Sequence, residues 1–204
     1  TKSGEISIPI LMPVGISTVD CREKLSMSEN EKVGFVLTVF GDEADMTRKA
    51  LESFHETIDY PHELTVMGTN LSESCRNIVA EYDCFVVETF QDLSLAKSLN
   101  LGIQDFLQQR DVKYISWIHN DMDYCRPWVA NLIKRLGEDK MIGKISPTNL
   151  RDGEGGEEHE GNECPWIIPT KIFDKVGIFD ENFVKGGEKE DWDMNRRIKN
   201  MGYK

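Results

Sequence analysis

The residues best suited to chemistry follow an apolar run in the middle of the chain. Residues 114–118 are mostly β-branched or aromatic, which is typical of a buried strand, and His119, Asn120, Asp121 and Asp123 come directly after them. Acidic side chains at the carboxyl end of a central strand lie where open α/β sheets bind ligands. Carboxylate oxygens there would suit a hard divalent cation. The same acids would also suit a solvated turn or the cap of a following helix, so spacing alone leaves both interpretations open.

A second acidic group begins the last predicted helix, at 188–201. Its first turn holds Glu188, Glu190, Asp191 and Asp193, and such charges are favoured there by the helix dipole. Capping needs only one or two acids, however, and gives no reason for the neighbouring Gly186-Gly187 and Trp192. Glycines allow close approach of the backbone, and an indole offers a flat apolar face of the kind that sugars stack against.

The elements that must position these two groups alternate along the first part of the chain. Apolar runs predict strands at 33–40, 62–67, 84–88 and 114–118, and apolar faces predict helices at 43–58, 71–82 and 93–107. This alternation is typical of a parallel sheet that is covered on both faces. Because right-handed crossovers place the strand ends on one edge, we expect the loops after Phe40, Met67 and Ile118 to form a nucleotide-sized crevice.

The pattern changes after Asp123. We expect a helix at 127–136 with Pro127 in its first turn, a strand at 141–146, and a mobile glycine- and acid-rich surface loop at 150–162 that could act as a lid. A strand at 166–169, a helix at 170–176 capped by Thr170, and a turn at 177–183 follow. Residues 1–32 show no clear period and predict an extension with one short strand at 6–12.

Composition excludes several classes of protein. The 204 residues suit one domain, and a net charge of −12 argues against a broad nucleic-acid surface, though not against a small phosphorylated ligand. The five cysteines form no C-x-x-C pair, which argues against a disulfide framework or a zinc site. No apolar run approaches the roughly 18 residues of a membrane span, and no targeting signal is visible, so we expect a soluble, cytoplasmic protein.

Four stretches, taken together, resemble glycosyltransferase family 2, whose members have the GT-A fold. They are 98–103, 118–129, 167–183 and 186–203, in the family's order. The resemblance implies an α/β, Rossmann-like fold with a mostly parallel central sheet, helices on both faces and a small mixed region on the acceptor side. It implies a single GT-A domain at 33–204 after the extension 1–32, with 33–123 as the nucleotide-binding half and 124–204 as the acceptor-side half.

The resemblance also implies a reaction, the transfer of a sugar from a nucleotide-diphospho-sugar to an acceptor hydroxyl with inversion. A divalent cation must stabilise the departing diphosphate, and a carboxylate must take the hydroxyl proton. Asp121 matches the family's metal-binding carboxylate for Mn²⁺ or Mg²⁺, while a shifted register would make Asp123 the ligand and His119 is a further candidate. Asp191 of the Glu190-Asp191 pair matches the catalytic base.

The binding residues that the resemblance implies include departures from the family pattern. Asn120 stands where a ribose-binding acid is usual, and 68–70 stand where many members have an aspartate that reads uracil; a UDP-sugar is the leading expectation for the donor. The donor-binding candidates are Val39, Gly68, Thr69, Lys97 and Asn120. The acceptor-binding candidates are Trp166, Gly187 and Trp192. Core packing is an alternative for Trp166, as a solvated helix face is for Lys97.

Other functions stay open at this point. A retaining transferase of the same fold is the nearest alternative. Because His119-Asn120 depart from the usual acidic pair, a catalytically silent module that binds sugar nucleotides or glycans is another. A nucleotidyltransferase is a weaker alternative, since it would be expected to carry a basic glycine-rich loop after the first strand and 41–45 is acidic. Family members usually continue past Gly202-Tyr203 into an acceptor subdomain, so the acceptor is not predicted.

Overall fold

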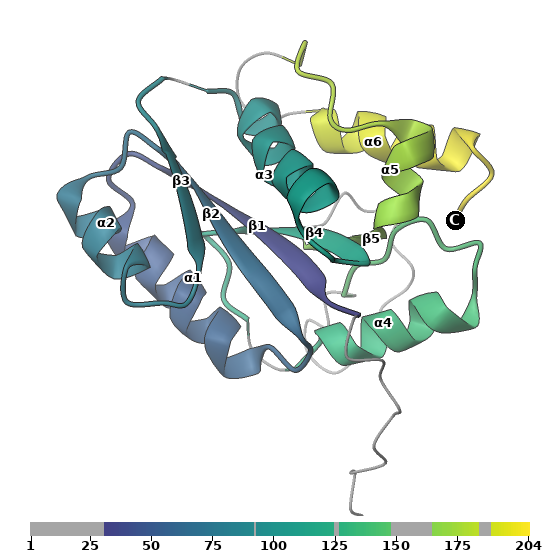
Figure 1. Cartoon of the computed structure of the whole chain (residues 1–204), viewed down its shortest axis with the longest axis horizontal. Helices are drawn as coiled ribbons and strands as arrows, with labels where there is room; N and C mark the ends of the chain where they lie inside the picture. Colours follow the sequence, from purple (N-terminus) through teal and green to yellow (C-terminus); the bar gives the residue numbers. More distant parts are fainter. Residues whose placement is uncertain (1–30, 92, 125–126, 148–164, 184–188) are drawn as a thin grey trace, which may run out of the picture.

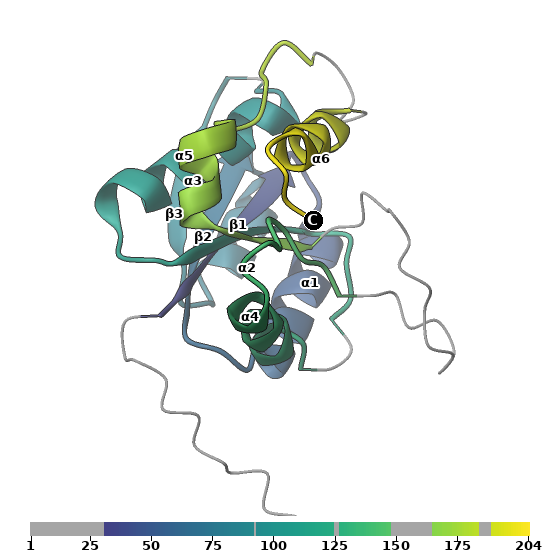
Figure 2. The same ribbon diagram turned by 90° about the vertical axis from the view of Figure 1, so that its right-hand side faces the viewer.

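A computed structural model describes residues 31–91, 93–124, 127–147, 165–183 and 189–204 (Figures 1 and 2). The predicted strand at 6–12, the loop at 150–162 and the glycines 186 and 187 lie outside these residues. The elements in chain order are β1 Val33–Phe40, α1 Ala44–Thr57, β2 His62–Thr69, α2 Glu73–Val79, β3 Phe85–Thr89, α3 Leu95–Gln109, β4 Tyr114–His119, α4 Val129–Glu138, β5 Trp166–Pro169, α5 Thr170–Val176 and α6 Glu190–Asn200.

The strands form one five-stranded sheet in the order β3-β2-β1-β4-β5. The first four strands are parallel, with Leu37 of β1 opposite Val66 of β2 on one side and Ile118 of β4 on the other. β5 runs antiparallel to β4. The predicted α/β class with a mostly parallel sheet is therefore confirmed.

Helices cover both faces of the sheet because alternate residues of the central strand point to opposite sides. Phe35 and Leu37 pack with Phe54 of α1, whereas Val36 packs with Ile103 of α3. Figures 1 and 2 show α1, α2 and α4 on one face and α3, α5 and α6 on the other. Since both faces are buried, β1 reads as a continuous apolar run in the sequence.

Three predictions in the second part of the chain are wrong, each because of a long-range contact. The segment 141–146 is not a strand of the sheet; only Ile145 pairs with Ile167, while the backbone around Gly143 pairs with the chain end at Lys204. Pro127 lies before α4 rather than in its first turn. Thr170 makes no capping hydrogen bond to its helix, because its hydroxyl donates to the carbonyl of Lys113.

The start of α4 has a cap that no local pattern predicts. The Asp59 carboxylate, which precedes β2, accepts hydrogen bonds from the amides of Val129 and Ala130 at 3.0 and 3.1 Å. This satisfies two of the amides that a helix start leaves unpaired.

Among the described residues, no helix combines the length and the hydropathy that a membrane crossing requires.

Candidate active site

The candidate site lies at the carboxyl edge of the sheet, where the chain leaves β1 toward β2 on one side and where β4 lies on the other. Open α/β sheets form ligand-binding crevices at such a reversal of strand order. The loops at this edge are bonded to one another: the amide of Gly41 donates to the carbonyl of Thr69 at 2.9 Å, and the amide of Asn70 donates to that of Thr89 at 2.9 Å. The loops after β1, β2 and β3 therefore form one connected rim.

Asn120 joins the end of β4 to the start of α1. Its side-chain amide donates to the Glu43 carboxylate at 2.6 Å and lies 3.4 Å from the Thr47 hydroxyl oxygen. The same Glu43 carboxylate accepts from the amide of Phe40, 3.4 Å away. Asn120 is thus held between the two strands that flank the crevice, and Glu43 is a partner that sequence reasoning did not identify.

His119 is affected by both acidic groups of the sequence, the one after β4 and the one at the start of α6. It ends β4 and is partly buried, and this burial lowers its pKa below the ordinary value. The carboxylates of Asp121, Asp191 and Glu190 act in the opposite direction on the same imidazole. Charges from two distant parts of the chain, the end of β4 and the start of α6, therefore act on one imidazole.

The first turn of α6 exposes its side chains to different degrees. Glu190 is buried, Asp191 is partly buried and Trp192 is 67% exposed. Burial raises the pKa of Asp191, and the neighbouring Glu190 charge raises it further, while the amide of Trp192, 2.7 Å from the carboxylate, and the charge of Lys144 lower it. A carboxylate with a raised pKa is a stronger proton acceptor than an ordinary aspartate.

Lys144 is a site residue that the sequence did not reveal. Its ammonium lies 3.6 Å from the ring centroid of Trp166, and its charge acts on Asp191. A lone lysine in a predicted strand carries no signal for this position.

Trp166 itself is fully buried and lies 4.5 Å from Trp117, between ring centroids, so its indole has no surface that an acceptor could touch. Trp166 is therefore a core residue and not an acceptor contact.

The donor-side candidates differ in accessibility. The side chains of Val39 and Thr69 lie in the core, 0% and 3% exposed. At Gly68, an added Cβ would lie 2.5 Å from the side chain of Leu71, so this glycine is explained by packing. Lys97 is exposed on the first turn of α3, where its backbone amide donates to the cap Ser94.

The two aspartates that follow β4 suit a divalent cation whose remaining ligands come from phosphate groups of a bound substrate. Asp121 and Asp123 are both exposed. Within the described parts of the chain, no three His, Cys, Asp or Glu side chains are grouped as a complete metal site. Mg²⁺ is commonly bound by one or two carboxylates together with substrate phosphates, and an exposed aspartate at the crevice fits that mode.

Asn100 connects two of the sequence motifs. It is 1% exposed on α3, and its side-chain amide donates to the carbonyl of Phe179 at 2.9 Å and to the Glu181 carboxylate at 3.0 Å. Its side-chain oxygen accepts from the amide of Phe179 at 2.9 Å. A buried amide that is satisfied on both sides fixes the segment before α6 against α3.

Several solved structures have a similar fold. Mannosyltransferase PcManGT from Pyrobaculum calidifontis, solved with GDP-Man and Mn²⁺, has a TM-score of 0.64 and 18% identity over 84% of this chain and 53% of its own. TarS 1-349 of S. aureus has a TM-score of 0.61 and 13% identity, with coverages of 82% and 55%. The structure of TarS 1-349 with UDP has a TM-score of 0.63 and 12% identity over 82% of this chain and 54% of its own. No protein-family model and no curated protein matches the chain.

The chain therefore shares the α/β fold of these solved structures. It spans about half the length of these solved structures. At such identities the likeness concerns the fold, and function must be argued from the site.

Proposed function

We propose that this chain carries the active site of a metal-dependent glycosyltransferase that moves a sugar from a nucleotide-diphospho-sugar to an acceptor hydroxyl with inversion. The observation that carries the proposal is that Asp121, which follows β4, and Glu190-Asp191, which begin α6, act on the same imidazole of His119 at the carboxyl edge of the sheet. It supplies one acid for the donor side and one for the acceptor side. Of the similar structures, one contains GDP-Man and one UDP, and a UDP-sugar remains our leading donor.

In this mechanism Asp191 is the general base. It takes the proton of the acceptor hydroxyl as that oxygen forms a bond to the anomeric carbon, and the bond from this carbon to the diphosphate breaks, with its electron pair leaving on the diphosphate. Glu190 supports the reaction through the raised pKa of Asp191, because its charge disfavours ionisation of its neighbour. Attack from the side opposite the leaving group inverts the anomeric centre.

On the donor side, Asp121, with Asp123 or His119 as further ligands, would hold Mn²⁺ or Mg²⁺. A divalent cation there would stabilise the charge that develops on the diphosphate. Asn120, held by Glu43, would hydrogen-bond a ribose hydroxyl, and Lys97 would approach the diphosphate from the start of α3. Donor binding is thus assigned to 33–123.

On the acceptor side, Trp192 is the best supported contact. Of the four tryptophans it alone is exposed, and it follows Asp191 directly. An indole in this position offers a stacking surface for a sugar ring. Gly187 would let the acceptor approach the backbone, and 124–204 would form the acceptor side.

Turnover of two variants tests the proposal. We expect Asp191→Asn to lose sugar transfer by about 10²-fold or more, the usual contribution of a general base, while nucleoside diphosphate binding is retained. Asp121→Asn should weaken the Mn²⁺ dependence of donor binding. Near wild-type transfer by Asp191→Asn, together with unchanged metal dependence of Asp121→Asn, would contradict the assignment.

Two alternatives give different results in the same assays. A retaining transferase would form a product with the donor's anomeric configuration, which NMR of the product detects. A silent binding module is favoured by His119-Asn120, which depart from the usual acidic pair. Calorimetric binding of UDP with Mn²⁺, without hydrolysis or transfer of any UDP-sugar or GDP-sugar, would support the module.

A further inference from the structure

β3 is an edge strand whose apolar side chains are exposed. In the described part of the chain it pairs with β2 alone, and Figure 1 shows it at the lateral edge of the sheet. Phe85, Val86 and Val87 are 60%, 48% and 39% exposed. Alternate residues of a strand point to opposite faces, so both faces of this edge are apolar. Edge strands are usually protected by lysine, proline or a covering element, and 84–89 contain neither lysine nor proline.

The opposite edge of the sheet is built differently. All the residues of β5 are buried, and Ile145 pairs with Ile167 of this strand. An apolar, exposed strand edge is therefore a property of β3 and not of β5. Association of two copies through the same edge is closed at two chains, because each copy uses the one edge that it offers.

The hydrogen bonds of β3 determine which backbone groups face outward. The amide of Asn70, which follows β2, donates to the carbonyl of Thr89 at 2.9 Å, so the backbone groups of Thr89 face β2. Successive residues of a strand direct these groups to opposite edges, so Val86 and Glu88 direct theirs outward. Both residues therefore present an amide and a carbonyl in the direction that a further strand would occupy.

The charges beside the apolar residues of this edge are paired within the chain. The Glu88 carboxylate accepts a hydrogen bond from the guanidinium of Arg76 at 2.6 Å. The guanidinium of Arg110 lies 3.7 Å from the ring centroid of Phe85 and donates to the Asp105 carboxylate at 2.7 Å. Although the whole chain has a net charge of −12, its self-repulsion is therefore reduced at this edge.

We propose that β3 pairs antiparallel with β3 of a second copy, about a two-fold axis at Val86, and so joins the two sheets into one. In this register Val86 lies opposite its own counterpart on one face, and Phe85 lies opposite Val87 on the other. Aromatic and β-branched pairs of this kind stabilise sheets. The carboxyl edges of the two sheets then face in opposite directions, so both crevices stay open. This inference does not depend on the proposed function.

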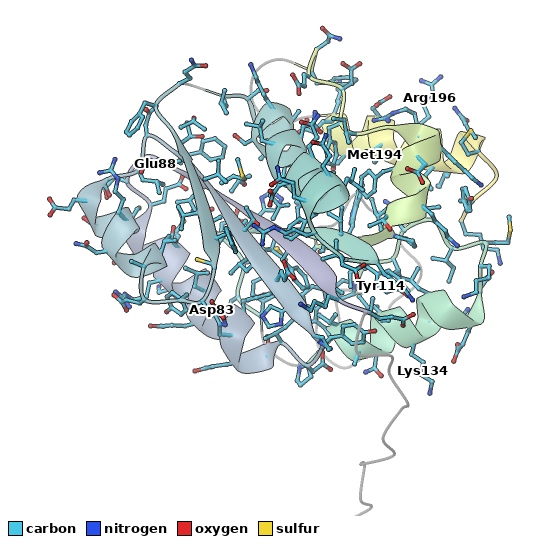
Figure 3. The ribbon with its side chains drawn as sticks, viewed as in Figure 1. Asp83, Glu88, Tyr114, Lys134, Met194 and Arg196 are labelled. Atoms are coloured by element: carbon cyan, nitrogen blue, oxygen red, sulfur yellow. The ribbon has the colours of Figure 1, made fainter. Side chains whose placement is uncertain are left out.

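The neighbouring two-fold registers are less favourable. An axis at Val87 would place Glu88 opposite the apolar Val86. An axis at Phe85 would place Val87 opposite Asp83, which Figure 3 labels together with Glu88. An axis at Glu88 would bring two like charges together, which is destabilising. The axis at Val86 sets the exposed apolar residues of β3 opposite one another, and this self-complementarity favours a second copy over an unrelated strand.

The area of the contact predicts a weak, reversible dimer. Phe85 and Phe90, which are 60% and 77% exposed, together expose about 270 Å² in each copy, since a phenylalanine has about 200 Å² of surface. With the two valines added, two copies still bury less than the about 1,200 Å² of standard stable complexes. We therefore expect dissociation constants in the micromolar range or above.

Sedimentation velocity of the whole chain tests the dimer. Between about 1 and 300 μM, wild type should shift from the mass of one chain toward that of two. Val86→Lys places two ammonium groups at the axis and should raise the dissociation constant by about 10-fold or more, because like charges then face each other. Met141→Lys is the matched control, since Met141 is 49% exposed in the segment after α4. It should dimerise like wild type, and both variants should melt like wild type.

A cysteine at the axis tests the register. In the proposed pairing the two Cα atoms of residue 86 lie about 5.5 Å apart, which a disulfide can span. Val86→Cys should therefore form a covalent dimer on oxidation with diamide. Because the chain has five cysteines of its own, mass spectrometry must identify the link between the two introduced cysteines. Val87→Cys, whose two copies would lie about 7–8 Å apart, should form little of this product.

Three results would overturn the proposal. The first is sedimentation as a single chain at every concentration, which is also expected if another segment of the same chain covers β3. The second is a dimer that Val86→Lys weakens no more than Met141→Lys does. The third is a disulfide dimer formed by Val87→Cys in place of Val86→Cys. None of these results bears on the proposed transferase, whose crevice lies at the carboxyl edge of the sheet.

Discussion

At the scale of single residues, opposing contributions set the pKa of Asp191, the proposed general base. Burial and the Glu190 charge raise the pKa of Asp191, and the Lys144 ammonium lowers it. Lys144 is held against the indole of Trp166, so its position depends on the core rather than on a mobile loop. In the proposed mechanism these neighbours determine the acidic limit of activity, because a base acts only when it is unprotonated.

The pH dependence of transfer follows from the direction of this shift. Because the pKa of Asp191 is raised from its ordinary value of 3.8, kcat/KM should increase with pH through a midpoint above that value. Lys144→Met removes a charge that lowers the pKa, so the midpoint should move to higher pH; Lys144→Arg should restore it. The measurement is kcat/KM as a function of pH for sugar transfer.

The control for this experiment is Lys134→Met, since Lys134 is an exposed lysine of α4 and points away from the sheet in Figure 3. It should leave the midpoint unchanged. An acidic limb that is identical in Lys144→Met and wild type would show that Lys144 does not act on the base.

At the scale of elements, the sequence predicted those parts whose side chains are buried on both sides. β1 and β5 have the predicted bounds, because apolar runs between turn residues leave no other assignment. α2 is shorter than predicted, at Glu73–Val79, because Ser72 caps it by accepting from the amide of Cys75. The wrong strand at 141–146 pairs with the chain end, a contact that no local pattern contains.

Two helical glycines should respond in opposite directions to the same substitution. At Gly102 of α3, an added Cβ would lie 2.7 Å from a methyl of Val36, which is fully buried in β1, whereas at Gly137 of α4 nothing lies within 4 Å. Alanine is favoured over glycine in helices by about 1 kcal/mol. Overpacking against a residue that cannot move costs about 1–3 kcal/mol and outweighs this gain at Gly102.

We therefore expect Gly102→Ala to lower the free energy of unfolding by about 1 kcal/mol, and Gly137→Ala to raise it by up to about 1 kcal/mol. Urea denaturation of both variants and of wild type measures the difference. Gly137 has no positive φ, so backbone strain does not oppose its substitution. Stabilisation by Gly102→Ala would mean that α3 does not approach the sheet as closely as described.

At the scale of the whole molecule, the candidate site joins the two halves of the chain. The charges of Asp121 and Asp191, the acids that the sequence singled out, act on one imidazole, and Asn100 ties α3 to the segment before α6. The sequence could indicate these residues because carboxylates after an apolar run and at a helix start are visible locally. Lys144 could not be indicated, because its position beside Trp166 and its effect on Asp191 depend on which strands and helices become neighbours.

Ligand-induced stabilisation tests whether the donor side acts as one unit with a cation. If Asp121 supplies only part of the coordination and the diphosphate supplies the rest, then Mn²⁺ and UDP or GDP should stabilise the chain together far more than either does alone. At a ligand concentration 100 times Kd the gain is about 2.7 kcal/mol, which raises Tm by about 5–10 °C in a chain of this size. Thermal melting with each component, with both, and with both plus EDTA measures this.

Asp121→Asn separates the cation from the nucleotide in the same experiment. An amide oxygen is a weaker ligand than a carboxylate, so this variant should lose most of the joint shift while its melting without ligand stays close to wild type, since Asp121 is exposed. Asp123→Asn should lose less if Asp121 is the principal ligand and more if the register is shifted by two residues. Equal shifts in wild type and both variants would contradict a cation at this strand end, because no other pair of carboxylates directly follows β4 in the described residues.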